Sequence, residues 1–157
     1  MSAINALLQQ FTRAVEAGDG AALAALFAED GIYHDGFYGP FQGRAAIADM
    51  LENHFHAHAR DLVWHMSDAI RVGDLGYASY RFGYTSTLPG HEGRRVVFTG
   101  MARLRFSDDL IQRYDEIFDQ GIGLVQIGFS PERIARRLEK AARALRDAPL
   151  SAPFLQA

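Results

Sequence analysis

Residues 29–43 read EDGIYHDGFYGPFQG, and this stretch decides the fold and carries the first candidate for chemistry. A short run typical of a β-strand ends in His34 and Asp35, after which glycine and proline turn the chain between large aromatic residues. Burial among aromatic rings raises the pKa of a carboxyl group and prepares it for proton transfer. The alternative is that His-Asp-Gly is ordinary turn chemistry, because an aspartate readily bonds to its own backbone.

Composition limits the classes of protein to which this chain can belong. At 157 residues the chain fits one domain with a single hydrophobic core. The sequence contains no cysteine, which excludes disulfides, thiolate metal sites and a cysteine nucleophile. No apolar run approaches the roughly 18 residues of a membrane span, and no charged-then-apolar leader opens the chain. These features predict a cytoplasmic protein that does not enter membranes.

The charge of the chain is unevenly distributed. The formal net charge is −3, whereas residues 132–146 hold six basic and two acidic residues, a net +4 that leaves −7 for the rest. A basic run confined to one helix usually forms a solvated face. The segment therefore predicts an exposed helix, and we expect no nucleic-acid partner.

Apolar periodicity predicts three helices in the first third of the chain. Apolar residues recur at helical spacing over 4–18, and again over 19–27 behind the capping residue Asp19. A third stripe runs over 44–57 and includes His54 among apolar neighbours. A strand that ends at Asp35 separates the second helix from the third.

From residue 61 onward the period changes to two, which predicts paired strands. We expect strands at about 62–66, 76–87, 94–106 and 110–119, joined by tight turns into an antiparallel meander. Ser130-Pro131 then begins a closing helix. N-terminal helices that cover one face of a strongly curved antiparallel sheet make an α+β fold. Strand alternation turns the following residues to the inward face: Tyr80, Phe82, Tyr84, Phe98, Gly100, Ala102, Tyr114, Glu116 and Phe118.

The order of these motifs resembles the NTF2-like superfamily over residues 4–120. The shared motifs are Ala-Gly-Asp (17–19), Glu-Asp-Gly-Ile-Tyr-His-Asp (29–35) and Phe-Gln-Gly-Arg (41–44). Residues 118–128, FDQGIGLVQIG, are similar to the end of SnoaL-like polyketide cyclases, which are related to ketosteroid isomerases. The resemblance implies an α+β cone, with an NTF2-like, SnoaL-like domain at 1–128 and a C-terminal helix and tail at 129–157. Because the superfamily includes several enzyme activities and proteins without catalysis, the fold does not fix the function.

The resemblance also implies roles for single residues. Asp35 lies where the ketosteroid isomerases of this superfamily keep their general base, whereas Phe11 and Ala102 occupy the positions of their two oxyanion donors. Loss of one such donor typically costs roughly 10²–10³ in rate, so we do not expect the steroid isomerase mechanism. Glu116 lies near the last-strand acid of limonene-epoxide-hydrolase-like members, but their Arg-x-Asp pair is missing. Asp119 matches the final acid of the cyclases.

The candidate site combines these acids with the aromatic residues of the predicted sheet. The candidate catalytic residues are Asp35, Glu116 and Asp119, of which alternation turns Glu116 inward and Asp119 outward unless a bulge intervenes. His54 and His58 have the i, i+4 spacing of a zinc pair, but no third ligand is visible, so we predict no metal. The candidate ligand-binding residues are Tyr33, His34, Phe37, His54, Trp64, Tyr80, Tyr84, Phe98, Tyr114 and Phe118.

The sequence therefore predicts a small-molecule pocket protein that performs proton transfer without a cofactor, as an isomerase, cyclase or dehydratase. The ligand expected in such an aromatic pocket is an apolar carbonyl or polycyclic compound. The alternative is a non-catalytic module that binds a ligand or a protein through the same fold. Apolar residues on the outer face of the sheet, Val63, Val97 and Met101, predict a homodimer.

Overall fold

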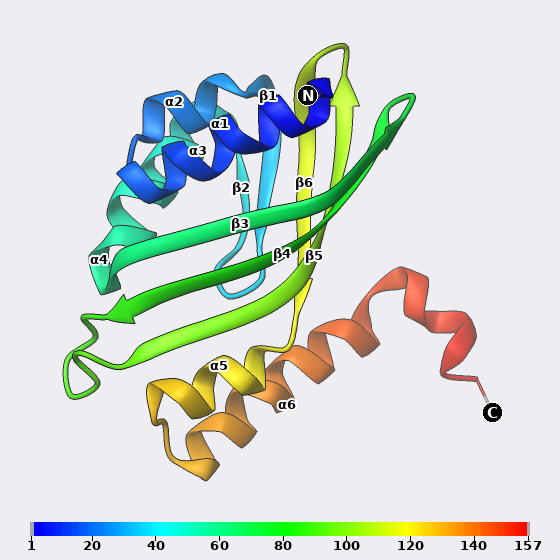
Figure 1. Ribbon diagram of the computed structural model, residues 1–157. Helices are drawn as coiled ribbons and strands as arrows, with labels where there is room; N and C mark the ends of the chain where they lie inside the picture. Colours follow the sequence, from blue (N-terminus) through cyan, green and yellow to red (C-terminus); the bar gives the residue numbers. More distant parts are fainter. Residues whose placement is uncertain (1, 157) are drawn as a thin grey trace.

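A computed structural model describes residues 2–156 and contains one curved, open sheet of six strands (Figure 1). The strand order is β2-β1-β6-β5-β4-β3. Together with the helices, this sheet makes the α+β fold that the sequence predicts. The strands are β1 (Phe27–Asp35), β2 (Gly39–Gln42), β3 (Ala59–Val72), β4 (Leu75–Ser86), β5 (Arg95–Ser107) and β6 (Leu110–Phe118).

Helices α1 (Ala3–Ala17) and α2 (Gly20–Ala25) confirm the first two predicted helices. α1 ends at Gly18, whose φ of 69° is a left-handed conformation that glycine adopts without steric cost. Asp19 caps α2 by accepting a hydrogen bond from the backbone N–H of Ala22 at 2.8 Å. α2 is shorter than predicted because the chain already enters β1 at residue 27.

The third predicted helix is one helical segment of changing pitch. It consists of α3 (Arg44–Asp49), a π-helical turn η1 (Met50–Phe55) and α4 (His56–His58). π-helical turns are rare and occur frequently at functional sites. Here the turn ends with Phe55 and is followed by His58, and the side chains of both residues line a pocket.

The sheet differs from the prediction in the strands that flank β1. β3 to β6 form the predicted antiparallel meander, whereas β1 runs parallel to β6 with Tyr33 opposite Tyr114. β2, in a segment predicted as a turn, pairs antiparallel to β1. A period of two in the sequence identifies a strand but not its neighbour, so a parallel pairing between distant segments leaves no local signal.

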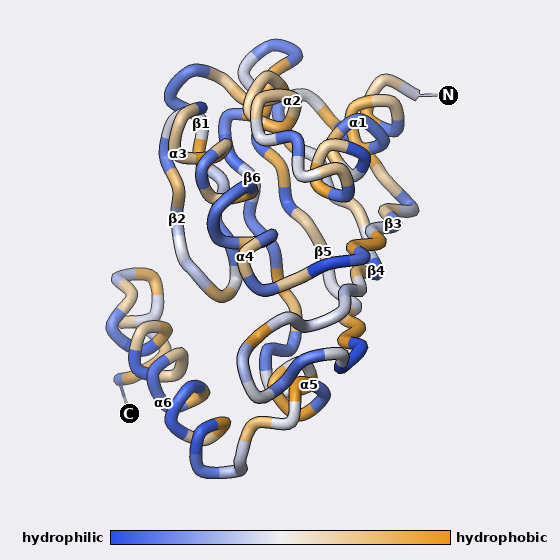
Figure 2. Tube along the Cα trace, turned by 90° about the vertical axis from the view of Figure 1, so that its left-hand side faces the viewer, coloured by the Kyte–Doolittle hydropathy of each residue, from blue (hydrophilic) through white to orange (hydrophobic). Residues whose placement is uncertain are grey.

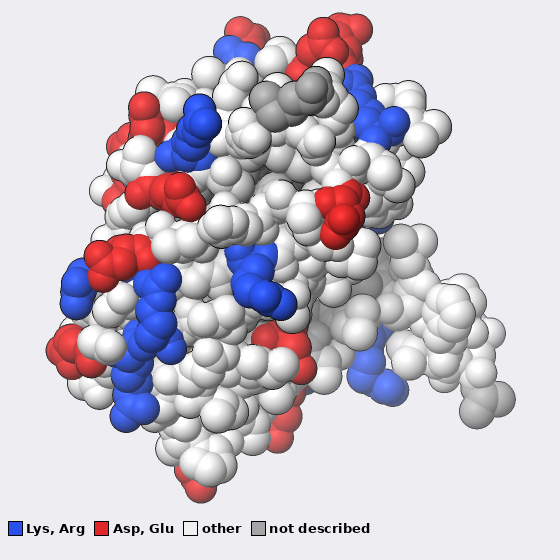
Figure 3. All heavy atoms as spheres, viewed as in Figure 1, with Lys and Arg blue, Asp and Glu red and all other residues white. Residues whose placement is uncertain are grey.

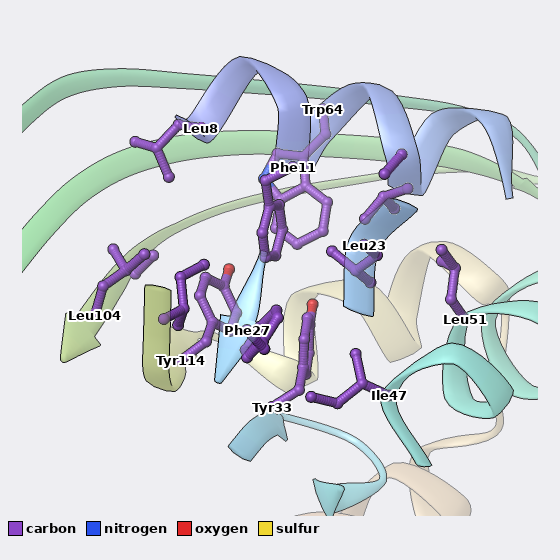
Figure 4. Close-up of a cluster of buried hydrophobic side chains, with 14 of the residues drawn as sticks. Leu8, Phe11, Leu23, Phe27, Tyr33, Ile47, Leu51, Trp64, Leu104 and Tyr114 are labelled. Carbon is purple, nitrogen blue, oxygen red and sulfur yellow. The ribbon is translucent and has the colours of Figure 1, made fainter. Parts of the chain in front are cut away.

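The core lies where the N-terminal helices meet the sheet (Figure 4). Phe11 of α1 is completely buried, and its ring centroid lies 5.0 Å from that of Tyr114, 5.5 Å from Trp64 and 6.0 Å from Tyr33. Aromatic pairs at such distances stabilise a core beyond the area that they bury. This aromatic layer holds α1, β1, β3 and β6 in fixed positions relative to one another.

Two helices follow the last strand. α5 (Gln120–Ile127) occupies the Gly- and Leu-rich stretch, and α6 (Pro131–Asp147) is the predicted closing helix with Ser130 as its cap. α6 contacts α5, and none of its side chains is buried. Figure 2 shows α6 set apart from the sheet and from α1 to α3. A short 3-10 turn, η2 (Pro149–Phe154), follows it.

The surface carries charges of both signs. Acidic and basic side chains are interspersed over the face of the molecule in Figure 3. Within residues 2–156, every helix falls short of the length and apolar character that a bilayer crossing requires.

Candidate functional site

A pocket lies between the inward face of the sheet, the turn after β1 and α4. Its cavity volume is about 90 Å³. One water needs roughly 10–15 Å³, so the cavity has room for more than a single water molecule. Nine aromatic side chains line it, together with the carboxyl groups of Asp35 and Glu116 and the imidazole of His58.

Asp35 ends β1 with its side chain buried, at 3% exposure. Its Oδ1 accepts hydrogen bonds from the backbone N–H groups of Phe37 and Tyr38, each at 2.7 Å. This is the turn chemistry that His-Asp-Gly predicts, so Asp35 is both a turn residue and a pocket acid. Burial raises the pKa of Asp35, and the two backbone N–H donors partly offset that rise.

Glu116 lies on β6 and lines the pocket, as strand alternation predicts. Its Oε1 accepts a hydrogen bond from the backbone N–H of Gly36 at 3.2 Å, and its Oε2 accepts one from the Tyr114 hydroxyl at 3.4 Å. Burial, and then the negative charge of Asp35, raise the pKa of Glu116 well above its usual range. Glu116 therefore retains its proton to a higher pH than an ordinary glutamic acid.

Asp35 and Glu116 are hydrogen-bonded to each other, so they titrate together. The backbone N–H groups on Asp35 favour its charged form, whereas the charge of Asp35 favours the neutral form of Glu116. The shared proton therefore resides on Glu116. Two carboxyl groups whose environments push their pKa values apart can divide the roles of acid and base.

Six of the ten predicted ligand-binding residues line the pocket: Phe37, Trp64, Tyr80, Tyr84, Phe98 and Phe118. Phe82, which alternation also turns inward, lies among them, and its ring stacks against that of Phe98 at an interplanar angle of 11°. These two rings, on neighbouring strands, lie nearly parallel in an aromatic wall whose other rings are mostly tilted against one another. Ligand binding by these residues stays a prediction.

Two of the predicted ligand-binding residues, Tyr33 and Tyr114, lie in the core instead of the pocket lining. Both are completely buried, and their ring centroids are 4.7 Å apart. They face each other because β1 and β6 are neighbouring parallel strands. Since that pairing could not be predicted locally, neither could the burial of these two rings.

His34 also lies outside the pocket, on the opposite face of β1 from Asp35. It contacts Asp115 at 3.2 Å in a cluster with Arg103 and Arg113. Burial acts to raise the pKa of Asp115, but hydrogen bonds from Arg113, Arg103 and His34 lower it to about 2. His34, predicted as a ligand-binding residue, therefore does not line this pocket, because successive side chains on a strand point to opposite faces.

His54, the fourth residue outside the lining, contacts the rings of Tyr38 and Phe41 and lies 3.7 Å from Asp49. His54 and His58 do not form a metal site with a third metal-ligating side chain in the described part of the chain. Among residues 2–156, no group of three or more histidine, aspartate or glutamate side chains is placed to hold a metal ion.

Asp119 lies outside the pocket as well. Its Oδ1 accepts hydrogen bonds from the backbone N–H groups of Gly121 at 2.8 Å and Ile122 at 3.3 Å, so it caps α5. The predicted alternative in which a bulge turns Asp119 inward is wrong. β5 and β6 keep a regular register from the pair Arg105 and Arg113 to the pair Gly100 and Phe118, where β6 ends.

Six lining residues were not predicted as ligand contacts: Tyr38, Phe55, His58, Ala59, Leu62 and Phe82, of which only Phe82 was expected on the inward face. Leu62 could have been found from its i, i+2 relation to Trp64. Tyr38 stands in the aromatic run after Asp35. Phe55 belongs to the apolar stripe of the third predicted helix, whereas His58 follows that stripe and had no such signal.

Comparison with solved structures finds the same fold at low sequence identity. A hypothetical protein with a ketosteroid isomerase-like fold from Catenulispora acidiphila matches with a TM-score of 0.72 and 21% identity, over 80% of this chain and 95% of that chain. A putative polyketide cyclase from Xanthomonas campestris matches with a TM-score of 0.65 and 24% identity, over 80% and 97%. An LEH-like epoxide hydrolase from M. tuberculosis matches with a TM-score of 0.64 and 16% identity, over 88% and 96%. These likenesses show a shared fold.

The sequence also matches a family model directly. A search of curated proteins finds no match. The SnoaL-like domain model matches residues 8–114, which is more than half of the chain. The matched region contains Asp35 and most of the aromatic wall, and it ends just before Glu116. This chain belongs to the SnoaL-like domain family.

Proposed function

We propose that this protein binds a flat, largely apolar carbonyl compound and catalyses proton transfer on it without a cofactor, as an isomerase, cyclase or dehydratase. The observation that carries the proposal is the hydrogen-bonded pair of Asp35 and Glu116 in an otherwise aromatic pocket. An apolar pocket with a few convergent polar groups of shifted pKa is typical of an active site.

Asp35 is the general base in this mechanism. The backbone N–H groups of Phe37 and Tyr38 both donate to Oδ1 of Asp35. Oδ2 is therefore the atom that accepts a proton from the carbon next to the ligand's carbonyl group. When the ketone is bound, the proton of Glu116 turns from Asp35 to the carbonyl oxygen, so that Glu116 acts as a neutral acid that donates a hydrogen bond to this oxygen. Asp35 then returns the proton to a different carbon, so that the product is an isomer and the pair ends as it began.

A second candidate function is a ligand-binding module without catalysis. It is favoured by the structural use of both acids, because Asp35 holds the turn after β1 and Glu116 binds the backbone of Gly36 in that same turn. In this alternative the pocket takes the same ligands. The two candidates differ in whether protons of a bound ketone exchange with solvent.

The pH titration of the two acids tests the proposed division of roles. We expect the carboxyl carbon of Glu116 to titrate well above the about 4.3 of an ordinary glutamic acid, and Asp35 to titrate above its usual range. The folded state then holds a proton that the unfolded chain has released, so stability falls as the pH rises from that unfolded value toward the folded pKa. Carboxyl-carbon NMR measures both titrations.

A matched pair of variants assigns the signals. Glu116→Gln should remove the high titration and flatten the fall of stability with pH, whereas Glu139→Gln, on the exposed surface of α6, should change neither. If Glu116 titrates like a free carboxyl group, the shared-proton mechanism is wrong.

We propose further that the protein is a homodimer paired through the outer face of its sheet. Val63 and Val97 are 42% exposed and Met101 is 53% exposed, on the face opposite the pocket. A cluster of exposed apolar side chains on a sheet usually marks an interface. The commonest arrangement for such a face is a two-fold contact with a second copy of the same chain.

Light scattering at micromolar concentration should therefore give twice the chain mass of 17.4 kDa. Met101→Glu should shift the mass toward one chain, because a charge is costly at the centre of an apolar interface. Val125→Glu, at an exposed apolar position of α5, is the matched control and should leave the dimer intact. A monomeric parent protein would disprove this proposal.

A further inference from the structure

Three side-chain polar atoms in the described part of the chain are buried without a hydrogen-bond partner. They are Oη of Tyr33, Nε1 of Trp64 and Oη of Tyr80. A buried donor without a partner costs stability, so each one requires an explanation. Trp64 and Tyr80 line the pocket and are each 4% exposed, whereas Tyr33 does not line it. Two unpaired donors in the wall of one pocket indicate that a ligand supplies the acceptor.

The Tyr80 side chain extends toward the two acids over Gly100, a residue without a side chain on the neighbouring strand. Tyr80 on β4 pairs with Gly100 on β5, and the next inward residue of β5, Ala102, pairs with Glu116 on β6. A Cβ atom at Gly100 would lie 2.6 Å from the Tyr80 hydroxyl and 2.5 Å from the carbonyl oxygen of Ile117. Because Gly100 has no side chain, the phenol ring lies over β5 and points toward β6.

The electrostatic environment agrees with this placement. Burial, and then the charges of Glu116 and Asp35, raise the pKa of Tyr80, so its hydroxyl lies within the field of the pair and keeps its proton. The hydroxyl nevertheless donates to neither carboxyl group. Its hydrogen is therefore available to an oxygen atom that a ligand places next to the pair.

We propose that the Tyr80 hydroxyl donates a hydrogen bond to the carbonyl oxygen of a ketone or aldehyde bound beside Asp35 and Glu116. The inference rests on the proposed function and extends it by one residue that contacts the ligand. When Asp35 removes a proton from the neighbouring carbon, negative charge develops on this oxygen. A donor fixed in a water-excluded site stabilises that charge without reorganisation. Phe11 and Ala102 have no polar side-chain atom and cannot donate a hydrogen bond to this oxygen. The Tyr80 hydroxyl supplies such a donor from β4.

The carbonyl stretching frequency of bound 1-tetralone, a flat apolar ketone, tests the proposal. A hydrogen bond lowers this frequency, so infrared spectra of the complex should show it below the value in an apolar solvent. Tyr80→Phe removes only the hydroxyl and should shift the frequency back up, weaken binding about 3–10-fold, and slow exchange of the ketone's α-protons about 10²–10³-fold.

Tyr33→Phe is the matched control, because it deletes another buried, unpaired phenol hydroxyl that is not part of the lining. It should leave the carbonyl frequency of bound 1-tetralone unchanged. An unshifted frequency in Tyr80→Phe, or no binding of the ketone up to millimolar concentration, would overturn the proposal. If the frequency depends on Tyr80 but the wild type exchanges no protons, the donor is established and proton transfer by Asp35 is wrong.

Discussion

Asp35→Asn is expected to slow the exchange of α-protons in a bound ketone by a factor of roughly 10²–10⁴, the usual contribution of a general base. The amide has the shape of the carboxylate, and its oxygen can still accept the hydrogen bonds from Phe37 and Tyr38. The turn after β1 and the affinity for the ketone should therefore persist. An amide cannot take up a proton at neutral pH, so only the chemical step is lost.

NMR of a panel of apolar ketones in deuterated water, beginning with 1-tetralone, measures this exchange without knowledge of the natural substrate. Asp119→Asn is the matched control, because asparagine caps a helix about as well as aspartate and the residue lies outside the pocket. It should exchange protons at the wild-type rate. Equal rates in Asp35→Asn and the wild type would reduce Asp35 to a turn residue and favour the non-catalytic module.

Phe11→Ala is expected to lower the free energy of unfolding by about 3–5 kcal/mol, the usual cost of truncating a fully buried aromatic residue. The ring contacts four other aromatic side chains from three strands, so its removal leaves a cavity that no single neighbour can fill (Figure 4). Small domains are stable by only about 5–15 kcal/mol, so this loss is a large fraction of the total. Urea unfolding monitored by tryptophan fluorescence measures it.

The control for this variant is Phe154→Ala, which removes the same ring at a position of 86% exposure. The expected change there is within about 0.5 kcal/mol. A loss below about 1 kcal/mol in Phe11→Ala would mean that the layer collapses around the gap, and that the core is more plastic than its close aromatic contacts indicate.

Elements with a strong local pattern could be predicted from the sequence. α1 and α6 follow apolar stripes and carry capping residues at Ser2 and Ser130, and the meander from β3 to β6 follows a period of two. Such patterns involve residues only a few positions apart along the chain, so they can be identified from the sequence without knowledge of the tertiary structure. The same alternation correctly turned Glu116 inward.

The errors in the candidate site have a common origin. His34 adjoins an acid of the motif and Asp119 matches one, but alternation from Asp35 and Glu116 turns both side chains away from the pocket. A motif conveys which residues are close in sequence. The side chain that reaches the pocket depends instead on the face of the strand, and that rule was available from the sequence.

The sequence by itself determined five of the six strands, most helices and the aromatic and acidic residues from which a pocket could be built. Only the tertiary structure decided that β1 lies parallel beside β6, and this pairing brings Asp35 into hydrogen-bonding contact with Glu116. It also buries Tyr33 against Tyr114 and removes both rings from the pocket. The physical reason is that backbone pairing is the same for any two strands, whereas the choice of partner depends on how the whole chain buries its apolar faces.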